Sequence, residues 1–223
     1  HLGLARAHGA ETRFGEAVAE WTADGNGVSV ATAAGRYRAD RLVLAAGPWM
    51  PELLRGAELP LQVERQTFHW YRPAAEPEAY GPARCPIALW EYAAGRFFAT
   101  FPDFGKGVKA QVHHEGARCT PGDVARETTA DDEAPVRELL GRFLPGAAGP
   151  LLATSVCLYT NTPDAHFVLD RHPDTPRVVV ASPCSGHGFK FSSAIGEVVA
   201  ALALDEPHPL DLSPFSISRF ATA

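Results

Sequence analysis

The sequence predicts a mixed α/β (α+β) fold in two parts, one a sheet-and-helix layer and the other a mixed, mainly antiparallel sheet. The β-branched run Val178–Val180 precedes a turn rich in Ser, Cys and Gly and then a helical pattern, which together make a strand–turn–helix unit. Several stretches between residues 61 and 113 have strand character, with Pro- and Gly-bearing loops between them. We therefore expect residues 1–50 and 151–223 to form one domain and residues 51–150 to form the other.

The first 50 residues predict a short helical turn followed by a small antiparallel meander. The chain opens at His1–Ala5 with a helical remnant, and Asp24–Gly27 is a strong turn signal between two alternating stretches. Prolines on both sides of Trp49 and Met50 then predict a change of chain direction, with a short helix over residues 52–55. Strands are expected over residues 16–21, 28–32 and 42–45.

The second part is expected to be a sheet with one solvated face. Its strands are predicted over residues 61–72, 87–92, 97–101, 108–113 and, returning to the first part, 151–160. Alternation places Lys109, Gln111 and His113 on one face, which is unusual for a core and expected for the floor of a site; a solvent-exposed face is the alternative. A helix is expected over residues 131–143, with its apolar side formed by Val136, Leu139, Leu140 and Phe143.

The turn after Val180 has the composition of a ligand-binding turn. Gly186 and Gly188 allow the backbone to approach a ligand closely or to take a positive φ. The helix that follows presents its positive N-terminus to an anionic or electron-rich partner. The alternative is a glycine turn that leads into a core helix. The apolar face of that helix is predicted to be Phe191, Ile195, Val198 and Leu202.

Composition excludes several classes of protein. The 223 residues are 46% hydrophobic and 21% charged, which is enough apolar material for a sizeable core. The net charge is −6 and the Lys and Arg residues are scattered, so nucleic acid is not an expected partner. No apolar run approaches the roughly 18 residues of a membrane span, so we expect no membrane partner and a cytoplasmic location. The four cysteines lack C-x-x-C spacing, which favours free thiols.

The string SGHGFKFSS at residues 185–193, followed by Ile195-Gly196-Glu197, resembles a segment of a known family of enzymes. It is similar to the C-terminal flavin-binding segment of the monomeric sarcosine oxidase and N-methyltryptophan oxidase group, which are D-amino-acid-oxidase-like, FAD-dependent amine oxidases. The strings ADRLVLAAGPW (39–49), FPDFG (101–105) and SVCLYT (155–160) resemble other parts of the same enzymes, in the same order.

This resemblance implies FAD as the cofactor and a set of site residues. It implies that Cys157 carries the flavin covalently, that Lys109 lies above the flavin face where oxygen reacts, and that His113 is the active-site histidine. It further implies that Tyr159 lines the substrate pocket and that Lys190 contacts a substrate carboxylate. The remaining residues expected at the cofactor are Gly47, Trp49, Gly186, His187, Gly188 and Phe189. No metal site is expected, because His113 and His114 are adjacent in a strand and should point to opposite faces.

Two features depart from the family pattern. No G-x-G-x-x-G motif occurs, so the chain reads as a C-terminal portion that lacks the unit holding the ADP half of the cofactor. We expect a companion fragment or a homodimer to cover the sheet edge that this leaves. In addition, Ala99 stands where the sarcosine oxidases have a tyrosine, which leaves the identity of the amine open.

The sequence therefore supports two hypotheses. The first is an FAD-dependent oxidase for the secondary amine of an amino acid, of the sarcosine or N-methyl amino acid type, which uses oxygen and forms hydrogen peroxide. The second is a folded portion without bound flavin, a structural or binding module. Cofactor content separates the two.

Overall fold

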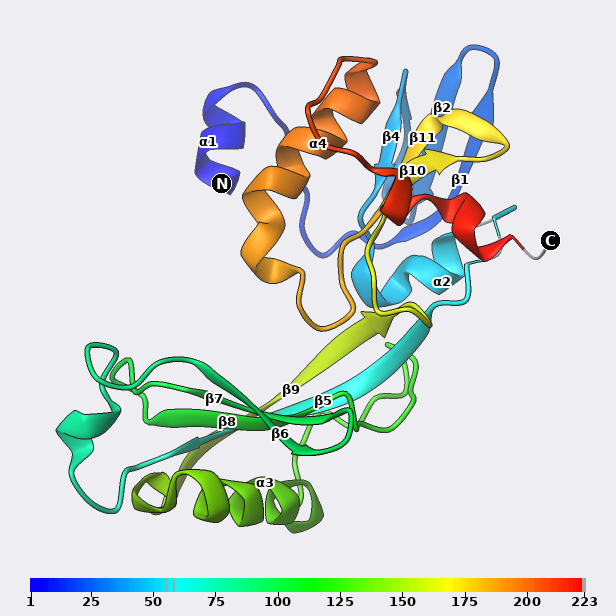
Figure 1. The fold of residues 1–223 in the computed structure, drawn as a ribbon. Coiled ribbons are helices and arrows are strands. Elements are labelled where there is room, and N and C mark those ends of the chain that lie inside the picture. Colours follow the sequence, from blue (N-terminus) through cyan, green and yellow to red (C-terminus); the bar gives the residue numbers. More distant parts are fainter. Residues whose placement is uncertain (55, 58, 222–223) are drawn as a thin grey trace.

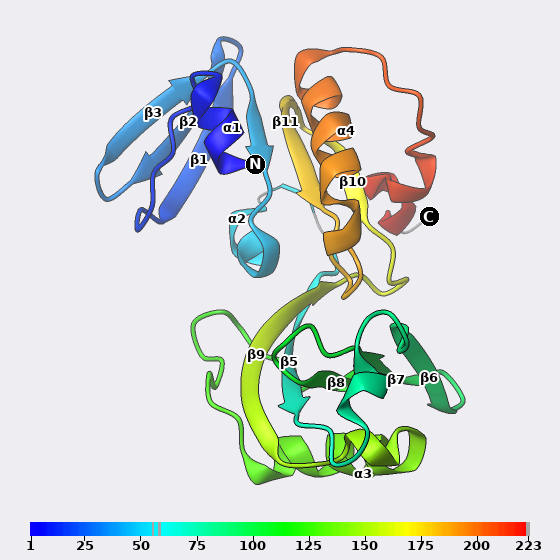
Figure 2. The same ribbon diagram turned by 90° about the vertical axis from the view of Figure 1, so that its left-hand side faces the viewer.

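The computed structural model describes residues 1–54, 56–57 and 59–221 and has two parts joined by long strands (Figure 1). The upper part in Figure 1 holds both termini, and the lower part is a sheet with one long helix beneath it. Strands β5 (Gln62–Tyr71) and β9 (Leu151–Asn161) run side by side from the junction into the lower sheet (Figure 1; Figure 2). The junction is therefore where residues of both parts can meet.

The upper part contains two three-stranded sheets (Figure 2). The predicted antiparallel pair before and after the Asp24–Gly27 turn is confirmed as β1 and β2, and it follows the short helix α1. The third strand of this sheet is β3, which was not predicted, whereas the predicted strand over residues 42–45 is β4 and lies in the other sheet. The second sheet has the order β10-β11-β4, in which β11 is antiparallel to β10 and parallel to β4. The elements are α1 (Leu2–Ala7), β1 (Val18–Asp24), β2 (Gly27–Thr32), β3 (Gly35–Ala39), β4 (Leu42–Leu44), β10 (Val168–His172) and β11 (Thr175–Ser182).

Strand β11 is buried on both faces, as its unbroken run of valines predicts. Val178 and Val180 pack into a cluster with Trp21 and Met50, whereas Ala181 faces a second cluster that includes Ile195 of helix α4 (Ser192–Leu204). A strand covered on both sides is expected to read as a continuous apolar run rather than as an alternation.

Helix α4 begins later, and faces the core somewhat differently, than the sequence predicts. The segment Phe189–Phe191 forms a short 3-10 helix, η4, before α4 starts at Ser192. Phe191 was expected on the apolar face but is 42% exposed, whereas Val198 and Ala201 are the buried residues of α4. The 3-10 turn rotates Phe191 away from the line of the helical face, and its ring instead meets the edge of Phe167 at 5.7 Å between ring centroids.

The lower sheet has five strands in the order β6-β7-β8-β5-β9, and every pairing within it is antiparallel. The parallel pairing of the mixed fold lies instead between β11 and β4 of the upper part. Residues 151–161 form β9, which pairs with β5 along its length, so the sheets place these residues with the region 51–150. The division into two domains otherwise stays a prediction. The other strands are β6 (Ala88–Ala93), β7 (Arg96–Phe101) and β8 (Val108–His113).

Helix α3 (Ala130–Phe143) covers one face of the lower sheet (Figure 1). Its buried residues Val136, Leu139 and Leu140 were all predicted, and they pack against residues of β5, β7 and β8. A capping box between Thr129 and Asp132 fixes the start of the helix. The opposite face of the sheet is thereby left to carry polar side chains.

Short helices fill the remaining connections. The predicted helix over residues 52–55 corresponds to α2 (Met50–Leu53), and Arg55 lies outside the described residues. The 3-10 helices are η1 (Gly47–Trp49), η2 (Pro77–Tyr80), η3 (Pro145–Ala147), η5 (Ser213–Phe215) and η6 (Ile217–Phe220). Within the described ranges, no helix has the length and hydropathy needed to cross a bilayer. The cytoplasmic location stays a prediction.

Candidate functional site

Strand alternation divides the side chains of the lower sheet between its two faces. Val108 and Ala110 of β8 pack toward α3, so Lys109, Gln111 and His113 lie on the opposite face, as predicted. Residues directly opposite each other on antiparallel strands share a face. The pairing of Lys109 with Trp70, of Gln66 with Cys157 and of Glu64 with Tyr159 therefore gathers the following residues on the face away from α3: Glu64, Gln66, Trp70, Lys109, Gln111, His113, Cys157 and Tyr159.

Lys109 lies in a cage of aromatic rings on this face. Its Nζ is 4.0 Å from the ring centroid of Phe68, 4.4 Å from that of Phe101 and 5.8 Å from that of Trp70. Burial lowers the pKa of Lys109, and the nearby thiol of Cys157 acts in the opposite direction. Since cation–π contacts favour the ammonium form, the cage holds a positive charge in a place where solvation is poor.

His113 and Tyr159 form a hydrogen-bonded pair that Gln111 joins. The Nδ1 of His113 is 3.1 Å from the hydroxyl of Tyr159, and the side-chain amide of Gln111 donates to the same hydroxyl at 3.0 Å. Burial, followed by the neighbouring imidazoles of His114 and His187, lowers the pKa of His113 to about 4. Burial also raises the pKa of Tyr159 to about 12. Both side chains are therefore neutral near pH 7.

The turn between β11 and η4 packs directly on this pair and requires glycine. Gly186 has a φ of 75°, and a Cβ there would lie 2.5 Å from Cε2 of Tyr159 and 3.1 Å from Cε1 of His113. A Cβ on Gly188 would lie 1.5 Å from the carbonyl oxygen of Pro183. The predicted close approach of the glycine backbone is therefore an approach to other parts of this chain, because the turn packs on the side chains of the sheet.

Two further histidines surround the pair. The rings of His113 and His114 are 4.1 Å apart between centroids, because His114 has a φ of 60° and its side chain turns back toward its neighbour. The expectation that the two rings point to opposite faces is therefore wrong, since β8 ends at His113. His187 stacks on Phe167 at 4.8 Å, and its Nε2 is 2.8 Å from the carbonyl oxygen of Ala165.

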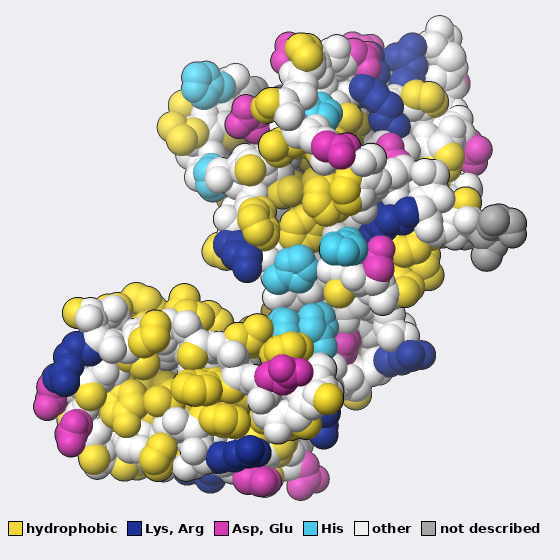
Figure 3. Space-filling view, viewed as in Figure 1, with side chains coloured by type: hydrophobic (Ala, Val, Ile, Leu, Met, Phe, Trp, Pro, Cys, Tyr) yellow, Lys and Arg dark blue, Asp and Glu magenta, His cyan; other side chains and the backbone are white. Residues whose placement is uncertain are grey.

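Figure 3 shows histidine side chains gathered at the junction of the two parts, below the hydrophobic side chains of the upper part. Despite this gathering, the described residues contain no group of three or more His, Cys, Asp or Glu side chains arranged to hold a metal ion.

Cys157 is a free thiol on the same face, directly opposite Gln66 of β5. Its Sγ lies 3.7 Å from the carbonyl oxygen of Leu158, which is a weak contact. Burial raises the pKa of this thiol, while the backbone of Leu158 and the positive charge of Lys109 lower it. Because burial is the larger effect, the thiol is protonated at neutral pH in this arrangement, and any thiolate would depend on Lys109.

The remaining predicted residues lie on the surface around the turn. Phe189 is 93% exposed, Trp49 is 48% exposed, and Gly47 has a φ of 53° with open space where a Cβ would be. Lys190 is also exposed, with its Nζ 5.4 Å from the Phe191 ring, and no hydrogen bond or ion pair between described residues joins it to the Lys109 cage or to His113.

Strand order explains why these surface residues lie near one another. Strands β4 and β11 are parallel neighbours, so the turns that follow them emerge at the same edge of the sheet. The turn after β4 contains η1, which also contacts β9, and the turn after β11 leads into η4 without a side-chain cap. A glycine turn, an uncapped helix start and exposed aromatic rings at the carboxyl edge of a sheet fit an electron-rich, planar ligand.

One carboxylate on this face has no predicted role. Glu64 accepts hydrogen bonds from the backbone N–H of Gly116 at 2.6 Å, from Nδ2 of Asn161 at 2.7 Å and from the amide of Gln66. Its other neighbour is Nδ1 of His114 at 4.0 Å. The alternation of side chains along the strand could have placed Glu64 on the site face, because Glu64 and Gln66 lie on one side of the strand and Arg65 on the other. Arg65 points to the opposite face and binds Asp132.

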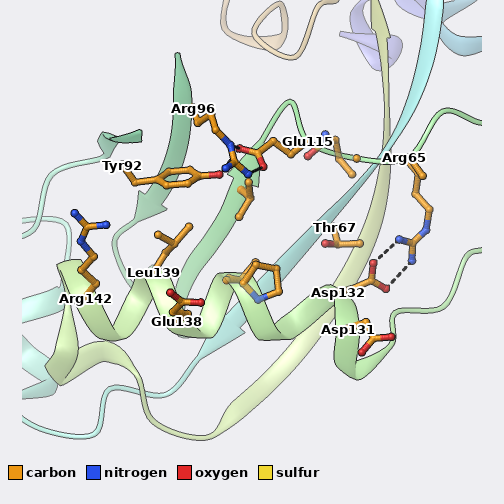
Figure 4. Close-up of a pocket in the computed structure, with 16 residues that line it drawn as sticks. Arg65, Thr67, Tyr92, Arg96, Glu115, Asp131, Asp132, Glu138, Leu139 and Arg142 are labelled. Carbon is orange, nitrogen blue, oxygen red and sulfur yellow. Dashed lines mark hydrogen bonds and ion pairs between the residues drawn. The ribbon is translucent and has the colours of Figure 1, made fainter. Parts of the chain in front are cut away.

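A separate cavity of about 460 Å³ lies between the sheet and α3, on the face away from Lys109 and His113 (Figure 4). Its charged side chains are largely paired with one another: Arg65 binds Asp132, and Arg96 binds Glu115. These pairs anchor the helix and the loop after β8, so the cavity is a structural feature of the helix-covered face.

The chain matches known flavoenzymes along nearly its whole length. The family described as DAO, FAD dependent oxidoreductase, matches residues 2–202. The monomeric sarcosine oxidase of Streptomyces avermitilis is 38% identical over all of this chain, and the N-methyl-L-tryptophan oxidase of Yersinia pestis is 37% identical over 87% of it. The chain spans 59% and 52% of the lengths of these two relatives.

Solved structures give the same result for the fold. NikD, an unusual amino acid oxidase essential for nikkomycin biosynthesis, is similar in its open form over 96% of this chain and 57% of its own, with a TM-score of 0.79 and 27% identity. The glycine oxidase of Geobacillus kaustophilus covers 96% of this chain and 55% of its own with a TM-score of 0.78, and at 20% identity it shows the likeness of fold alone.

Proposed function

This chain belongs to the FAD dependent oxidoreductase family, and from that premise we propose that it is the flavin-attachment and substrate-binding portion of an amine oxidase. The observation that carries the proposal is the shared sheet face on which Lys109, His113, Cys157 and Tyr159 meet under the turn of Gly186. The substrate class that we propose is a secondary amine of an amino acid, of the sarcosine or N-methyl amino acid type.

The chemistry that FAD supplies when bound is a two-electron transfer, in which the C–N bond of the amine is oxidised to an imine and dioxygen is reduced to hydrogen peroxide. The residues present fit such a group. The exposed rings of Trp49 and Phe189 and the uncapped start of η4 suit a planar, electron-rich ring, and the Sγ of Cys157 lies on the same sheet face as Lys109. We propose that Gly47, His187 and Gly188 line this site through their backbone.

Each side chain of the shared face then has a role that its environment supports. Lys109 holds a positive charge in an aromatic cage, where it stabilises negative charge that develops as oxygen is reduced. Cys157 is the covalent attachment point, with Lys109 as the cation that promotes its thiolate. Lys190, exposed at the start of η4, is free to bind a substrate carboxylate.

Ala99 and Tyr159 shape the substrate pocket in this proposal. Ala99 lies directly opposite Gln111 and therefore on the site face, where its methyl group leaves more room than a large side chain would. The pocket thus accepts an amine with a larger substituent than a methyl group at that wall. Tyr159, bonded to His113, forms the polar wall opposite.

The test of flavin attachment is a visible absorption spectrum of the purified chain before and after acid precipitation, with an intact mass. We expect a yellow protein that keeps its colour in the acid pellet and has the mass of the chain plus one FAD. The variant Cys157→Ser should lose the covalent flavin, because an alcohol at this position does not replace a thiolate.

Cys119→Ser is the matched control, since Cys119 is a free thiol in the loop after β8. It should keep the covalent flavin. Covalent flavin retained in Cys157→Ser would refute Cys157 as the attachment point. A colourless protein at the bare-chain mass would instead favour the second hypothesis, a folded portion that does not bind flavin.

We further propose that another polypeptide segment packs against β4 and α4. Strand β4 is the last strand of its sheet, and α4 is apolar around most of its circumference, with Leu204 64% exposed. A helix that is apolar on all sides is normally buried. The part of the relatives that lies outside the match is the occupant we favour. Light scattering should then give the mass of a monomer, and hydrogen exchange should show rapidly exchanging amides in β4. A dimer with protected β4 amides would identify a second copy as the occupant.

A further inference from the structure

Gln111 occupies a buried position between His113 and Tyr159. Its side chain is on the site face of β8 and the residue is 4% exposed. Its Nε2 is 3.0 Å from the hydroxyl of Tyr159 and 3.5 Å from Nδ1 of His113, and these two atoms are 3.1 Å apart. Three hydrogen-bonding atoms therefore form a closed triangle with little room for water or for another partner.

Counting the hydrogen-bond donors decides which atom of this triangle carries each proton. The amide nitrogen of Gln111 can only donate, and it donates to the oxygen of Tyr159. The single proton of the hydroxyl is then left for the nearest acceptor, which is Nδ1 of His113. The contact of 3.5 Å between the Gln111 amide nitrogen and Nδ1 is longer than an ordinary hydrogen bond. Because the hydroxyl donates to Nδ1, that nitrogen has no proton, and a neutral imidazole must carry its proton on Nε2.

No charged group among the described neighbours competes for Nδ1. The imidazoles of His114 and His187 approach His113 from the end of β8 and from the turn. Glu64 of β5 is the nearby carboxylate, and its oxygens are bonded to Gln66, to Asn161 and to the backbone after β8. The tautomer of His113 is thus decided by the amide and the hydroxyl.

We infer that Gln111 is a positioning residue that fixes His113 as the neutral imidazole protonated on Nε2. His113 then offers a hydrogen-bond donor at Nε2 and no basic nitrogen there. On the proposed function, this means that His113 orients an acceptor, such as the carboxylate of an amino acid, and does not take the proton of the amine. The tautomer of His113 does not itself depend on the presence of flavin.

The experiment is an NMR measurement on the full chain with ¹⁵N-labelled histidine. Two-bond ¹H–¹⁵N correlations across the imidazole ring distinguish the two neutral tautomers, and the signal missing from His113→Gln assigns His113 among the nine histidines. We expect the Nε2–H form to exceed the Nδ1–H form by at least about fivefold, the ratio that one ordinary hydrogen bond supports. A dominant Nδ1–H form in the wild type would overturn the inference.

Two variants of Gln111 test the cause. Gln111→Glu has nearly the same shape, but its carboxylate only accepts, so Tyr159 should donate to it and His113 should invert to the Nδ1–H form with a raised pKa. Gln111→Met keeps the volume without a hydrogen bond, so the Tyr159 hydroxyl can either donate to Nδ1 or accept from an Nδ1–H, and the two tautomers should approach equal populations. If Gln111→Met keeps the wild-type ratio of tautomers, the amide does not set the tautomer, and the inference fails.

The outcome can be separated from that of the proposed function. If Gln111→Glu does not fold, the wild-type tautomer still decides the inference. Flavin content, measured on the same samples, tests the oxidase proposal alone, because the correlation spectra need no cofactor. A positioning role also predicts that Gln111→Glu, unlike Gln111→Met, raises the midpoint of the His113 titration curve, which a purely structural role would not do.

Discussion

Acidification should destabilise the folded chain through His113. The pKa of this imidazole is about 4 in the folded chain, against its ordinary value of 6.5, because burial disfavours the charged form. Above about pH 6.5 both states hold a neutral imidazole, and the shift has no effect on stability. As the pH falls toward 4, the imidazole is protonated in the unfolded chain but stays neutral in the folded chain. This difference lowers the free energy of unfolding by at most about 3 kcal/mol.

Two other buried histidines act in the same direction. Burial also lowers the pKa of His69 and of His114, so both resist protonation in the folded chain. His69 is fully buried, and neither of its ring nitrogens has a hydrogen-bond partner among the described residues. The carboxylate with the clearest interior ion pair, Asp132, has a pKa of about 2, so its loss falls in a lower pH range. The range between about pH 4.5 and 6.5 therefore reports on the histidines.

The assay is urea unfolding followed by tryptophan fluorescence at a series of pH values, with wild type compared with His113→Gln. The variant has no titrating group at this position, so its stability should fall less, with the two curves diverging by about 2 kcal/mol at about pH 5. Comparing slopes with pH removes any constant packing cost of the substitution. His8→Gln, at an exposed position after α1, is the control and should follow the wild type. Parallel curves for wild type and His113→Gln would refute the burial argument.

Two further predictions test the turn and the start of α3. Gly188→Ala should lower stability by at least about 3 kcal/mol in thermal unfolding, because its Cβ would overlap the carbonyl of Pro183. Gly196→Ala lies in α4 with open space around its Cβ and should instead stabilise the chain by up to about 1 kcal/mol. Equal effects of the two substitutions would contradict the predicted overlap. Asp132→Asn should cost about 2 kcal/mol near pH 7, because the carboxylate binds Arg65 and closes the capping box, and the difference from wild type should vanish as the pH falls below about 2.

Most of the strands were predictable from the sequence, but β3 and β10 were not. The predicted strand over residues 108–113 is β8, and the sharing of one face by Lys109, Gln111 and His113 followed from the period of two alone. β10 was missed, although Pro173 and Asp174 form a turn signal between β10 and β11. Its hydrophobic run is only Phe167-Val168-Leu169, which is too short to read as a strand without its partner.

Much of the candidate site lay beyond sequence reasoning because loops bring it together. The left-handed φ of His114 returns its ring to the side of His113, and nothing in a string of adjacent residues indicates such a turn. The pairing of β5 with β9, which are some ninety residues apart in the chain, brings Glu64 opposite Tyr159. Contacts at such separation depend on the topology of the sheet, which local patterns do not specify.

The two-faced character of β5 restricts how this protein can change during evolution. His69 and Tyr71 face the helix-covered core, whereas Glu64, Gln66 and Phe68 face the candidate site. Because side chains alternate strictly along a strand, inserting or deleting one residue within β5 would send the core residues into the site and the site residues under α3. Homologues should therefore vary β5 by substitution only, and differ in length in loops such as residues 102–107.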